Sequence, residues 1–354
     1  MQIESQSPTD VVASYKAKID ESISRFFDRK EEETKDVLSK RVIKIIRDYT
    51  EGGGKRLRPI FMILGYRLFS PEEKGIFDAS ISIELAQSYL LIHDDVIDKS
   101  DVRRGKPSMH IRLEDAFVAG CPQSRSTAEG LAIVAGDLAE SYAHEALLRS
   151  GFYSENLVKA DLELSKTIEM TGYGQFLDIL STTMDDFNEG DLIRLHLWKT
   201  AKYTLEGPLA MGAILSGTEY DITALREYGR VLGIAFQLKD DILGLFGDEK
   251  TIGKSVYSDV NEGKKTLLMI KAMEWGDRDD ANFIRKMLRK GNVTNEEFER
   301  IKKLVMDTGS YDYSINLMGK LVDKSKEYLA KVSGDNYVKK ILDWLSDYLI
   351  SRDH

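Results

Sequence analysis

Apolar positions recur at spacings of three and four residues along most of the chain, which is the period of an amphipathic helix. Clear examples are Val11–Lys30, Ala128–Arg149 and Ile222–Phe246. Alternating strand patterns bounded by Asn-Gly or Asp-Gly turns are absent from the sequence. The pattern predicts an all-α protein. Because no linker-like segment or internal repeat divides it, we expect one domain over residues 1–354.

Glycine and proline residues mark where these helices are expected to end and begin. The segment EGGGKRLRP breaks the second helical pattern, and its Pro59 can open the next helix. Ser70 is expected to be an N-cap, because proline and two acids follow it in SPEE. A helix over Asp191–Ser216 is expected to be interrupted at Gly207 and Pro208.

One apolar helical run ends in the acidic stretch LLIHDDVIDKSDVRRG. Residues four apart on a helix project from nearly the same face, so Asp94 and Asp98 point the same way. Like charges at that spacing cost about 0.2–0.5 kcal/mol, and a divalent cation would reverse the sign of that contribution. Magnesium is commonly held by one or two carboxylates plus substrate phosphates. Taken alone, this stretch fits a magnesium site and a solvated helix end equally well.

A second acidic pair makes the metal hypothesis stronger. Asp240 and Asp241 again interrupt an apolar helical run, in GIAFQLKDDILG, with Gln237 on the same side as Asp240. Two such pairs suggest carboxylates that face each other and share cations, as in metal sites of helical bundles. Neither pair fits the calcium-loop pattern of acids at alternate positions followed by glycine.

Basic residues supply the opposite charge. The segment GGGKRLRP combines flexible backbone with Lys55, Arg56 and Arg58, which suits a polyanionic group approached closely by the chain. It is not a P-loop, because no Ser or Thr follows the lysine. Other basic residues follow the first aspartates or lie near loops and helix kinks, namely Arg103, Arg104, Lys199, Lys254 and Lys264.

Together the two acidic pairs and the separate cations describe a site for more than one phosphate group. Taken singly, each lysine fits an ordinary surface position better than a binding site. The neighbouring helices are rich in large apolar side chains, among them Tyr89, Phe176 and Phe236. Diphosphates with an apolar tail are isoprenoid precursors, so the expected substrates are of this kind.

The composition bears on the class of protein and on its cellular location. The net charge of −9 argues against a nucleic-acid binder, because phosphate neutralisation needs a basic surface. The single cysteine, Cys121, excludes an internal disulfide framework and suits a reducing cytoplasm. No run approaches the roughly 18–20 apolar residues of a membrane span, and the amino terminus lacks a signal-peptide pattern. We therefore expect a soluble cytoplasmic protein without a membrane span.

These motifs resemble those of the trans-isoprenyl diphosphate synthases, most closely the archaeal type of geranylgeranyl diphosphate synthase. The matching segments occur in family order and are GGKRLRP, DDVIDKSDVRRG, GQFLD, Lys199-Thr200, FQLKDD and GKSVYSDVNEGKKT. The resemblance implies a single all-α bundle around a deep central cavity, usually in homodimers. It also implies Mg²⁺-dependent prenyl transfer from an allylic diphosphate (dimethylallyl, geranyl or farnesyl) to isopentenyl diphosphate.

The resemblance assigns roles residue by residue. Asp94 and Asp98 would hold two of three Mg²⁺ ions and Asp240 the third, while Asp95 and Asp241 complete the two acidic motifs. Isopentenyl diphosphate would bind to Lys55, Arg58, Gln87 and Arg104. The allylic diphosphate would contact Arg103, Lys199, Thr200, Gln237, Lys254 and Lys264. The sequence departs from the commonest family form at Gly244, where many members have a third aspartate.

The residues before the first aspartates bear on product length. In this family, bulk at Tyr89 and Ala86 would form the floor of the cavity. Farnesyl-making members usually add a second adjacent aromatic or an insertion in the first motif, and this chain has neither, since Leu90 follows Tyr89. Geranylgeranyl diphosphate is therefore the expected product. The alternatives are a farnesyl or longer-chain synthase, a terpene cyclase, which would not need GGKRLRP, and a non-catalytic partner subunit.

Overall fold

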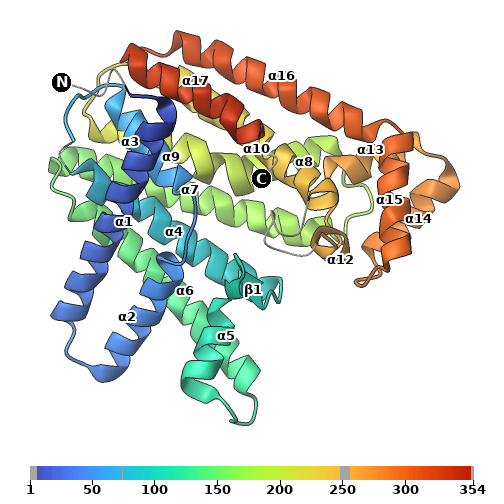
Figure 1. Ribbon diagram of the computed structural model, residues 1–354, viewed down its shortest axis with the longest axis horizontal. Helices are drawn as coiled ribbons and strands as arrows, with labels where there is room; N and C mark the ends of the chain where they lie inside the picture. The colour runs from blue at the N-terminus through green and yellow to red at the C-terminus, as the bar shows by residue number, and fades with distance from the viewer. Residues whose placement is uncertain (1–5, 74, 248–255, 352–354) are drawn as a thin grey trace. The chain divides into compact units, whose positions relative to one another are not determined.

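The computed structural model describes residues 6–73, 75–247 and 256–351, and almost all of its elements are helices (Figure 1). This confirms the predicted all-α class. The chain forms two compact units, the first made of Met1–Ser165, Pro208–Tyr220 and Gly334–Lys340. The second comprises Lys166–Gly207, Asp221–Ser333 and Ile341–His354. The single domain over residues 1–354 stays a prediction.

The first unit is built around one deeply buried helix, α4. Its elements are α1 (Pro8–Glu33), α2 (Val37–Thr50), α3 (Leu57–Arg67), α4 (Ile76–Ile97), α5 (Met109–Leu113), the π-helical η1 (Glu114–Val118), α6 (Ser124–Leu148), the start of α7 (Ser154–Ser181) and most of α9 (Gly207–Leu215). Helices α4 and α6 run side by side (Figure 1). Helix α4 is buried on nearly every side from Ile76 to Ser88, and most of its residues there are apolar or small.

Close helix packing in the first unit depends on glycine. A Cβ atom on Gly65 would lie 2.2 Å from the Leu209 carbonyl oxygen, and one on Gly212 would lie 1.9 Å from that of Met62. Helices α3 and α9 can approach this closely only because neither glycine carries a side chain. The apolar residues of α3 are thereby fixed in the core.

Two details of the first unit differ from the predictions. The predicted helix start at Ser70 is wrong: α4 begins at Ile76, and the Ser70 hydroxyl accepts a bond from the Glu72 amide in a local turn. After α4 the chain forms a short antiparallel ribbon, β1 (Val102–Arg103) and β2 (Lys106–Pro107). Its turn residues Arg104 and Gly105 both have positive φ, 54° and 70°, as tight hairpin turns require.

The second unit packs the long helix α10 against several others, with α16 alongside it (Figure 1). Its elements are the rest of α7, α8 (Glu189–His196), the π-helical η2 (Leu197–Glu206), α10 (Thr223–Phe246), α12 (Ser258–Asn261), α13 (Leu267–Trp275), α14 (Arg278–Leu288), α15 (Asn295–Asp307), α16 (Ser310–Lys331) and most of α17 (Asn336–Ile350). Across the parts of the chain that the structure describes, no helix is long and apolar enough to cross a membrane.

The interruption predicted at Gly207 and Pro208 starts ten residues earlier. The helix changes from α to π geometry at Leu197, and the π turns continue to Glu206. Its last bond runs from the Gly207 amide to the Lys202 carbonyl, five residues back. π-Helical segments are rare and frequently mark functional sites.

Candidate functional site

The carboxyl end of α4 presents two of its three aspartates outward. Asp94 and Asp98 are half-buried, and the Asp98 amide donates to the Asp94 carbonyl 2.8 Å away, so the two residues lie one turn apart. Asp95 between them is fully buried. The predicted pair Asp94 and Asp98 is therefore brought together, and Asp95 points elsewhere.

Asp95 is held inside the first unit by two donors. Its Oδ2 accepts from the Tyr49 hydroxyl at 3.0 Å and its Oδ1 from Arg103 Nε at 2.8 Å. Burial raises the pKa of Asp95 above the usual carboxyl range, although Arg103 opposes that shift. Burial and the Asp95 charge raise the pKa of Tyr49, which keeps its hydroxyl a donor. Arg103 also reaches Asp94 Oδ2, 3.3 Å from its Nη2, and so joins both aspartates.

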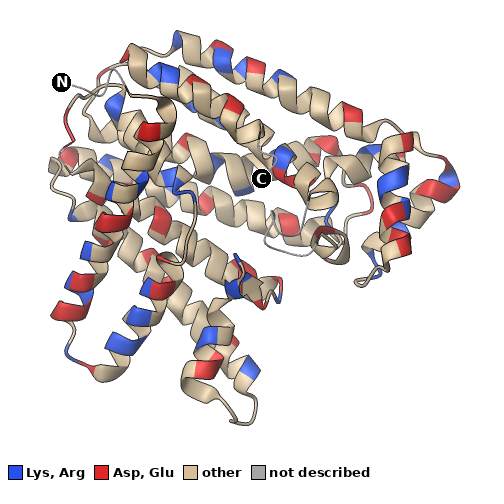
Figure 2. Ribbon diagram, viewed as in Figure 1, with Lys and Arg blue, Asp and Glu red and all other residues tan. Residues whose placement is uncertain are grey.

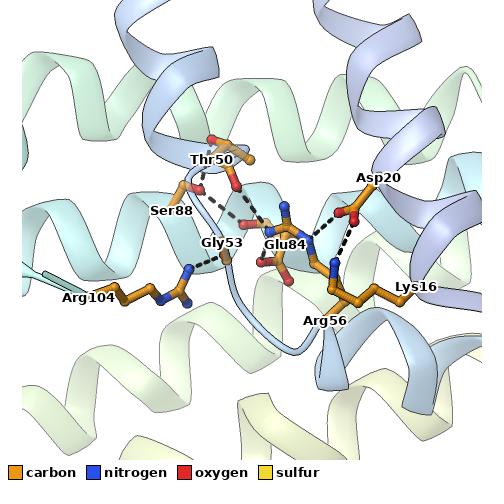
Figure 3. Close-up of polar contacts among 8 residues, drawn as sticks. All are labelled: Lys16, Asp20, Thr50, Gly53, Arg56, Glu84, Ser88 and Arg104. Atoms are coloured by element: carbon orange, nitrogen blue, oxygen red, sulfur yellow. Dashed lines mark hydrogen bonds and ion pairs between the residues drawn. The ribbon is translucent and has the colours of Figure 1, made fainter. Parts of the chain in front are cut away.

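The glycine loop after α2 carries the second set of predicted residues. Gly53 and Gly54 have φ values of 115° and 125°, which only glycine adopts readily. The Gly53 carbonyl accepts from Arg104 Nη1 at 2.6 Å, so the ribbon after α4 is fastened to this loop (Figure 3). Partial desolvation lowers the pKa of Arg104, and the nearby guanidinium of Arg58 lowers it further. Such crowding of cations favours a bound anion.

The cations of the loop do not all face solvent. Lys55 is exposed and Arg58 is half-buried, whereas Arg56 is buried, with 4% of its surface exposed. Gln87, on α4, is also buried. Acidic and basic residues lie together at the end of α4 and along the following ribbon (Figure 2).

Lys106 and Arg112 lie near Arg103 and Arg104 and were not predicted from the sequence. A small cavity of about 20 Å³ is lined by Tyr49, Gly52, Leu91, Arg103, Arg104, Lys106 and Arg112. The Arg112 guanidinium lies 5.6 Å from the centre of the Tyr49 ring. The signal available in the sequence was proximity alone, because Lys106 and Arg112 follow the RRG motif within a few residues.

In the second unit, the predicted lysine on η2 is held by an aspartate on α7. Lys199 Nζ donates to Asp178 Oδ2, the last residue of the GQFLD motif. The glycine of that motif is required by packing, because a Cβ atom on Gly174 would lie 2.4 Å from the Lys199 amide nitrogen. The motif therefore positions Lys199 through backbone proximity and an ion pair.

A chain of polar contacts connects η2 with α10. The Thr200 hydroxyl donates to Gln237 Oε1 at 2.7 Å, and Gln237 Nε2 donates to Asp241 Oδ1 at 2.9 Å. Asp241 is buried, and its Oδ2 lies 3.2 Å from His196 Nε2. Asp240, one residue earlier, is exposed. The sequence did not single out His196, and a lone histidine in a helix gives no usable signal.

The structure gives a physical reason for Gly244. A Cβ atom at this position would lie 2.2 Å from Asp259 Oδ2, so the carboxylate of Asp259 occupies the space that a side chain at 244 needs. Asp259 also accepts the Lys264 amide through its carbonyl at 2.9 Å. The Lys264 ammonium pairs with Glu262. Lys254, a predicted ligand of the allylic diphosphate, lies outside the described residues.

The donor set fits magnesium. Asp94, Asp98 and Asp240 offer carboxylate oxygens, the ligands that Mg²⁺ prefers. Within the described residues, no group of three or more His, Cys, Asp or Glu side chains could hold a metal ion by itself. Magnesium is commonly held by one or two carboxylates together with substrate oxygens and water.

The apolar residues predicted near the site have different exposures. Ala86 is fully buried and Tyr89 half-buried, with its ring edge-on to His93 at a centroid distance of 4.8 Å. Phe176 is 72% exposed, so α7 does not bury it in the second unit. That Phe176 contributes to the apolar surroundings of the site stays a prediction.

The sequence model of the polyprenyl synthetase family matches residues 39–305. The chain belongs to the polyprenyl synthetase family. A geranylgeranyl diphosphate synthase of Sulfolobus acidocaldarius is 33% identical over 85% of this chain and 87% of its own. A geranylfarnesyl diphosphate synthase of Aeropyrum pernix is 32% identical over 85% of this chain and 91% of its own.

A solved structure extends the similarity to the fold. The geranylgeranyl pyrophosphate synthase of Corynebacterium glutamicum, complexed with isoprenyl diphosphate and magnesium, has a TM-score of 0.89 at 29% identity. The match covers 96% of this chain and 98% of that one. The predicted resemblance, the all-α fold and the class of activity are thereby confirmed, and this polyprenyl synthetase is a prenyltransferase.

Proposed function

We propose that this prenyltransferase condenses isopentenyl diphosphate with an allylic diphosphate, head to tail, and that its main product is geranylgeranyl diphosphate. The observation that carries the proposal is the separation of charge in the first unit. Asp94 and Asp98 present acids on one helix turn, while Lys55, Arg58 and Arg104 gather on or beside the glycine loop. Acids suit a metal-bound diphosphate, and lysine and arginine side chains suit a second diphosphate that binds without metal.

The allylic diphosphate would be the metal-bound substrate. Its ligands through magnesium would be Asp94 and Asp98 in the first unit and Asp240 in the second. Bound magnesium would neutralise the charge that develops on the leaving diphosphate. Direct contacts would come from a separate group of residues, namely Arg103, Lys199, Thr200, Gln237, Lys254 and Lys264. Three ions per active site remain our expectation.

Isopentenyl diphosphate would be held without metal by Lys55, Arg58, Gln87 and Arg104. Arginine forks match diphosphate oxygens with two parallel hydrogen bonds. Arg104 is already held in place by the Gly53 carbonyl, which reduces the rotamer freedom lost on binding.

The chemistry follows from these charges. The basic residues stabilise the departing diphosphate, so the allylic carbon–oxygen bond ionises to a delocalised carbocation. The isopentenyl double bond attacks that carbon and forms the new carbon–carbon bond. The departing diphosphate then takes the proton lost from the adduct. The products are inorganic diphosphate and an allylic diphosphate that is longer by one isoprene unit.

One experiment tests the proposal directly. The protein is incubated with labelled isopentenyl diphosphate, Mg²⁺ and dimethylallyl, geranyl or farnesyl diphosphate in turn, and the products are sized by chromatography. We expect incorporation that stops when magnesium is chelated. Absence of incorporation with every allylic substrate would contradict the proposal.

Product length is proposed to depend on Tyr89, with Ala86 deeper in α4. A helix rises about 1.5 Å per residue, which puts Tyr89 roughly 7 Å below Asp94. The contact with His93 limits the freedom of the Tyr89 ring. We expect Tyr89→Ser to lengthen the products, and an unchanged size distribution would exclude Tyr89 as the floor. The geranylfarnesyl-making relative favours a longer product as the second candidate.

We also propose that the protein forms a homodimer through the apolar surfaces of α6 and α7. Both helices expose large apolar side chains at helical spacing, on α6 Leu131 and Val134, and on α7 Val158, Leu162, Tyr173, Phe176 and Leu180. Exposed apolar side chains that gather on one surface often mark a protein–protein interface. Sedimentation of wild type should give a dimer, and Leu162→Glu with Phe176→Glu should shift it to a monomer. Lys159→Glu, at an exposed polar position of α7, is the control.

The cytoplasm is the proposed location. The chain has one cysteine, Cys121, and this thiol is exposed. A chain that cannot form an internal disulfide suits a reducing compartment, where disulfides are rare. Fractionation that found the protein in a secreted pool would contradict this proposal.

A further inference from the structure

Arg56 is the one cation of the glycine loop whose side chain turns into the protein. Only 2% of its side chain is exposed, while its neighbour Lys55 is exposed. Its backbone has φ 53° and ψ 31°, the left-handed conformation that non-glycine residues rarely adopt. No side chain caps the first turn of α3, which begins at the next residue. The contacts of the guanidinium must therefore stabilise this conformation.

The guanidinium of Arg56 joins three helices of the first unit. Its Nη1 donates to Glu84 Oε1 on α4 at 2.6 Å and to the Thr50 carbonyl at the end of α2 at 3.0 Å. Its Nε donates to Asp20 Oδ1 on α1 at 2.8 Å. Burial lowers the pKa of Arg56, but Glu84 and Asp20 more than offset this and raise it overall. The group is thus a permanent buried cation with a fixed set of partners.

Glu84 extends the connection along α4. It is 3% exposed, and its helix turn also contains Gln87 and Ser88. The Ser88 hydroxyl donates to the Glu84 carbonyl at 3.2 Å and shares a hydrogen bond with the Thr50 hydroxyl at 2.9 Å. In Figure 3 the loop passes between two guanidinium groups, with Arg104 bound to Gly53 on one side and Arg56 bound to Glu84 on the other.

We propose that Arg56 and Glu84 form a positioning pair that fixes the glycine loop for isopentenyl diphosphate without touching that substrate. The inference rests on the proposed function and adds two residues to it. Because the pair ties the loop to the helix turn that contains Gln87, it sets the spacing between Lys55 and Gln87. Displacement of a binding group by about 1 Å can cost up to about a hundredfold in rate. Loss of the contact between Arg56 and Glu84 should therefore weaken the binding of isopentenyl diphosphate in particular.

The test compares Glu84→Gln with Arg56→Lys. Glutamine keeps the shape of Glu84, and Arg56 retains Asp20 and the Thr50 carbonyl, so we expect the variant to fold. Lysine keeps the charge of Arg56 but cannot reach three partners in a fixed fork. The matched control is Glu145→Gln, which changes a half-buried carboxylate of the same unit that pairs with Lys30.

The expected result is a larger change in the KM for isopentenyl diphosphate than in the KM for the allylic diphosphate. Both variants should raise the KM for isopentenyl diphosphate about tenfold, a change of about 1.4 kcal/mol, and leave the allylic KM within about twofold. Calorimetric titration with isopentenyl diphosphate alone should show the same loss of affinity. Glu145→Gln should change neither value.

Other outcomes overturn the inference. A defect in Arg56→Lys with none in Glu84→Gln would mean that Arg56 contacts the diphosphate itself. Equal rises in both KM values, or a Glu84→Gln variant that behaves like Glu145→Gln, would reduce the pair to a structural role. If wild type incorporated no isopentenyl diphosphate, the proposed function would fail. The calorimetric titration would then still decide whether the pair positions a diphosphate site.

Discussion

The two Asp-Asp pairs of this chain resemble each other in sequence and differ in how the protein holds them. In each pair the second aspartate is buried, Asp95 on α4 and Asp241 on α10. The first is half-buried in one pair, Asp94, and exposed in the other, Asp240. Consecutive residues on a helix point about 100° apart, so one cation cannot be met equally by both members of a pair. In each double aspartate one carboxylate is therefore more exposed and the other is buried.

The two buried aspartates, Asp95 and Asp241, have different hydrogen-bond partners. Asp95 is surrounded by the Arg103 guanidinium and the Tyr49 hydroxyl, so both of its oxygens accept hydrogen bonds. Asp241 has the neutral amide of Gln237 on one oxygen, and the other lies near His196 without a hydrogen bond among the described residues. The first motif is fixed by a full charge and the second by an amide. Removing the inward charge should therefore cost more in the first motif than in the second.

The largest expected effect is on the outward members. Asp94→Ala and Asp240→Ala should each lower kcat by about 10²–10³-fold, the usual loss when one electrostatic contact to the leaving group is removed. Steady-state incorporation of labelled isopentenyl diphosphate measures this. The matched control is Asp137→Ala, an exposed acid on α6. Full activity of Asp240→Ala together with an inactive Asp241→Ala would reverse the assignment of outward and inward roles.

The next effect concerns stability in the first motif. Asp95→Asn removes the nearer of the two carboxylates that pair with the partly buried Arg103 and leaves only Asp94, at 3.3 Å. The free energy of unfolding should fall by about 2 kcal/mol, since Arg103 keeps some solvent contact. Urea denaturation measures the loss. Asp98→Asn serves as the control, because removing one of two like charges a turn apart should leave stability equal or slightly higher. A loss of the same size in both variants would show that Asp95 is not the specific partner of Arg103.

How far the sequence predicts these arrangements depends on the range of the interaction. Helices such as Ile222–Phe246 follow from local periodicity, and α10 begins and ends within one residue of that range. The acidic motifs and their basic neighbours follow from residue type and order. The inward turn of Asp95 does not, because it depends on Tyr49 on a different helix. By residue type Arg56 belongs with Lys55 and Arg58, and its contacts with Glu84, Asp20 and the Thr50 carbonyl separate it from them.

The features that the sequence did not predict also depend on contacts beyond the local segment. The helix start predicted at Ser70 used a correct local cap signal, and the structure uses that hydroxyl in a turn before α4. The π geometry of η2 leaves no distinct period over ten residues, and η2 lies close to α7 at Gly174 and to α10 at Gly233, contacts between separate segments. Gly244 was noted as a departure from the family, but its reason, the carboxylate of Asp259, comes from a separate segment.

The smallest expected effect is the counterpart in the second motif, and it tests the comparison most directly. Asp241→Asn keeps an oxygen for the Gln237 amide and adds an N–H that can meet His196, so the contacts survive in neutral form. The free energy of unfolding should fall by no more than about 1 kcal/mol, the net value of one altered hydrogen bond. If urea denaturation showed a loss as large as that of Asp95→Asn, Asp241 would be held as strongly as Asp95. The different partners of Asp95 and Asp241 would then stabilise the protein to the same extent.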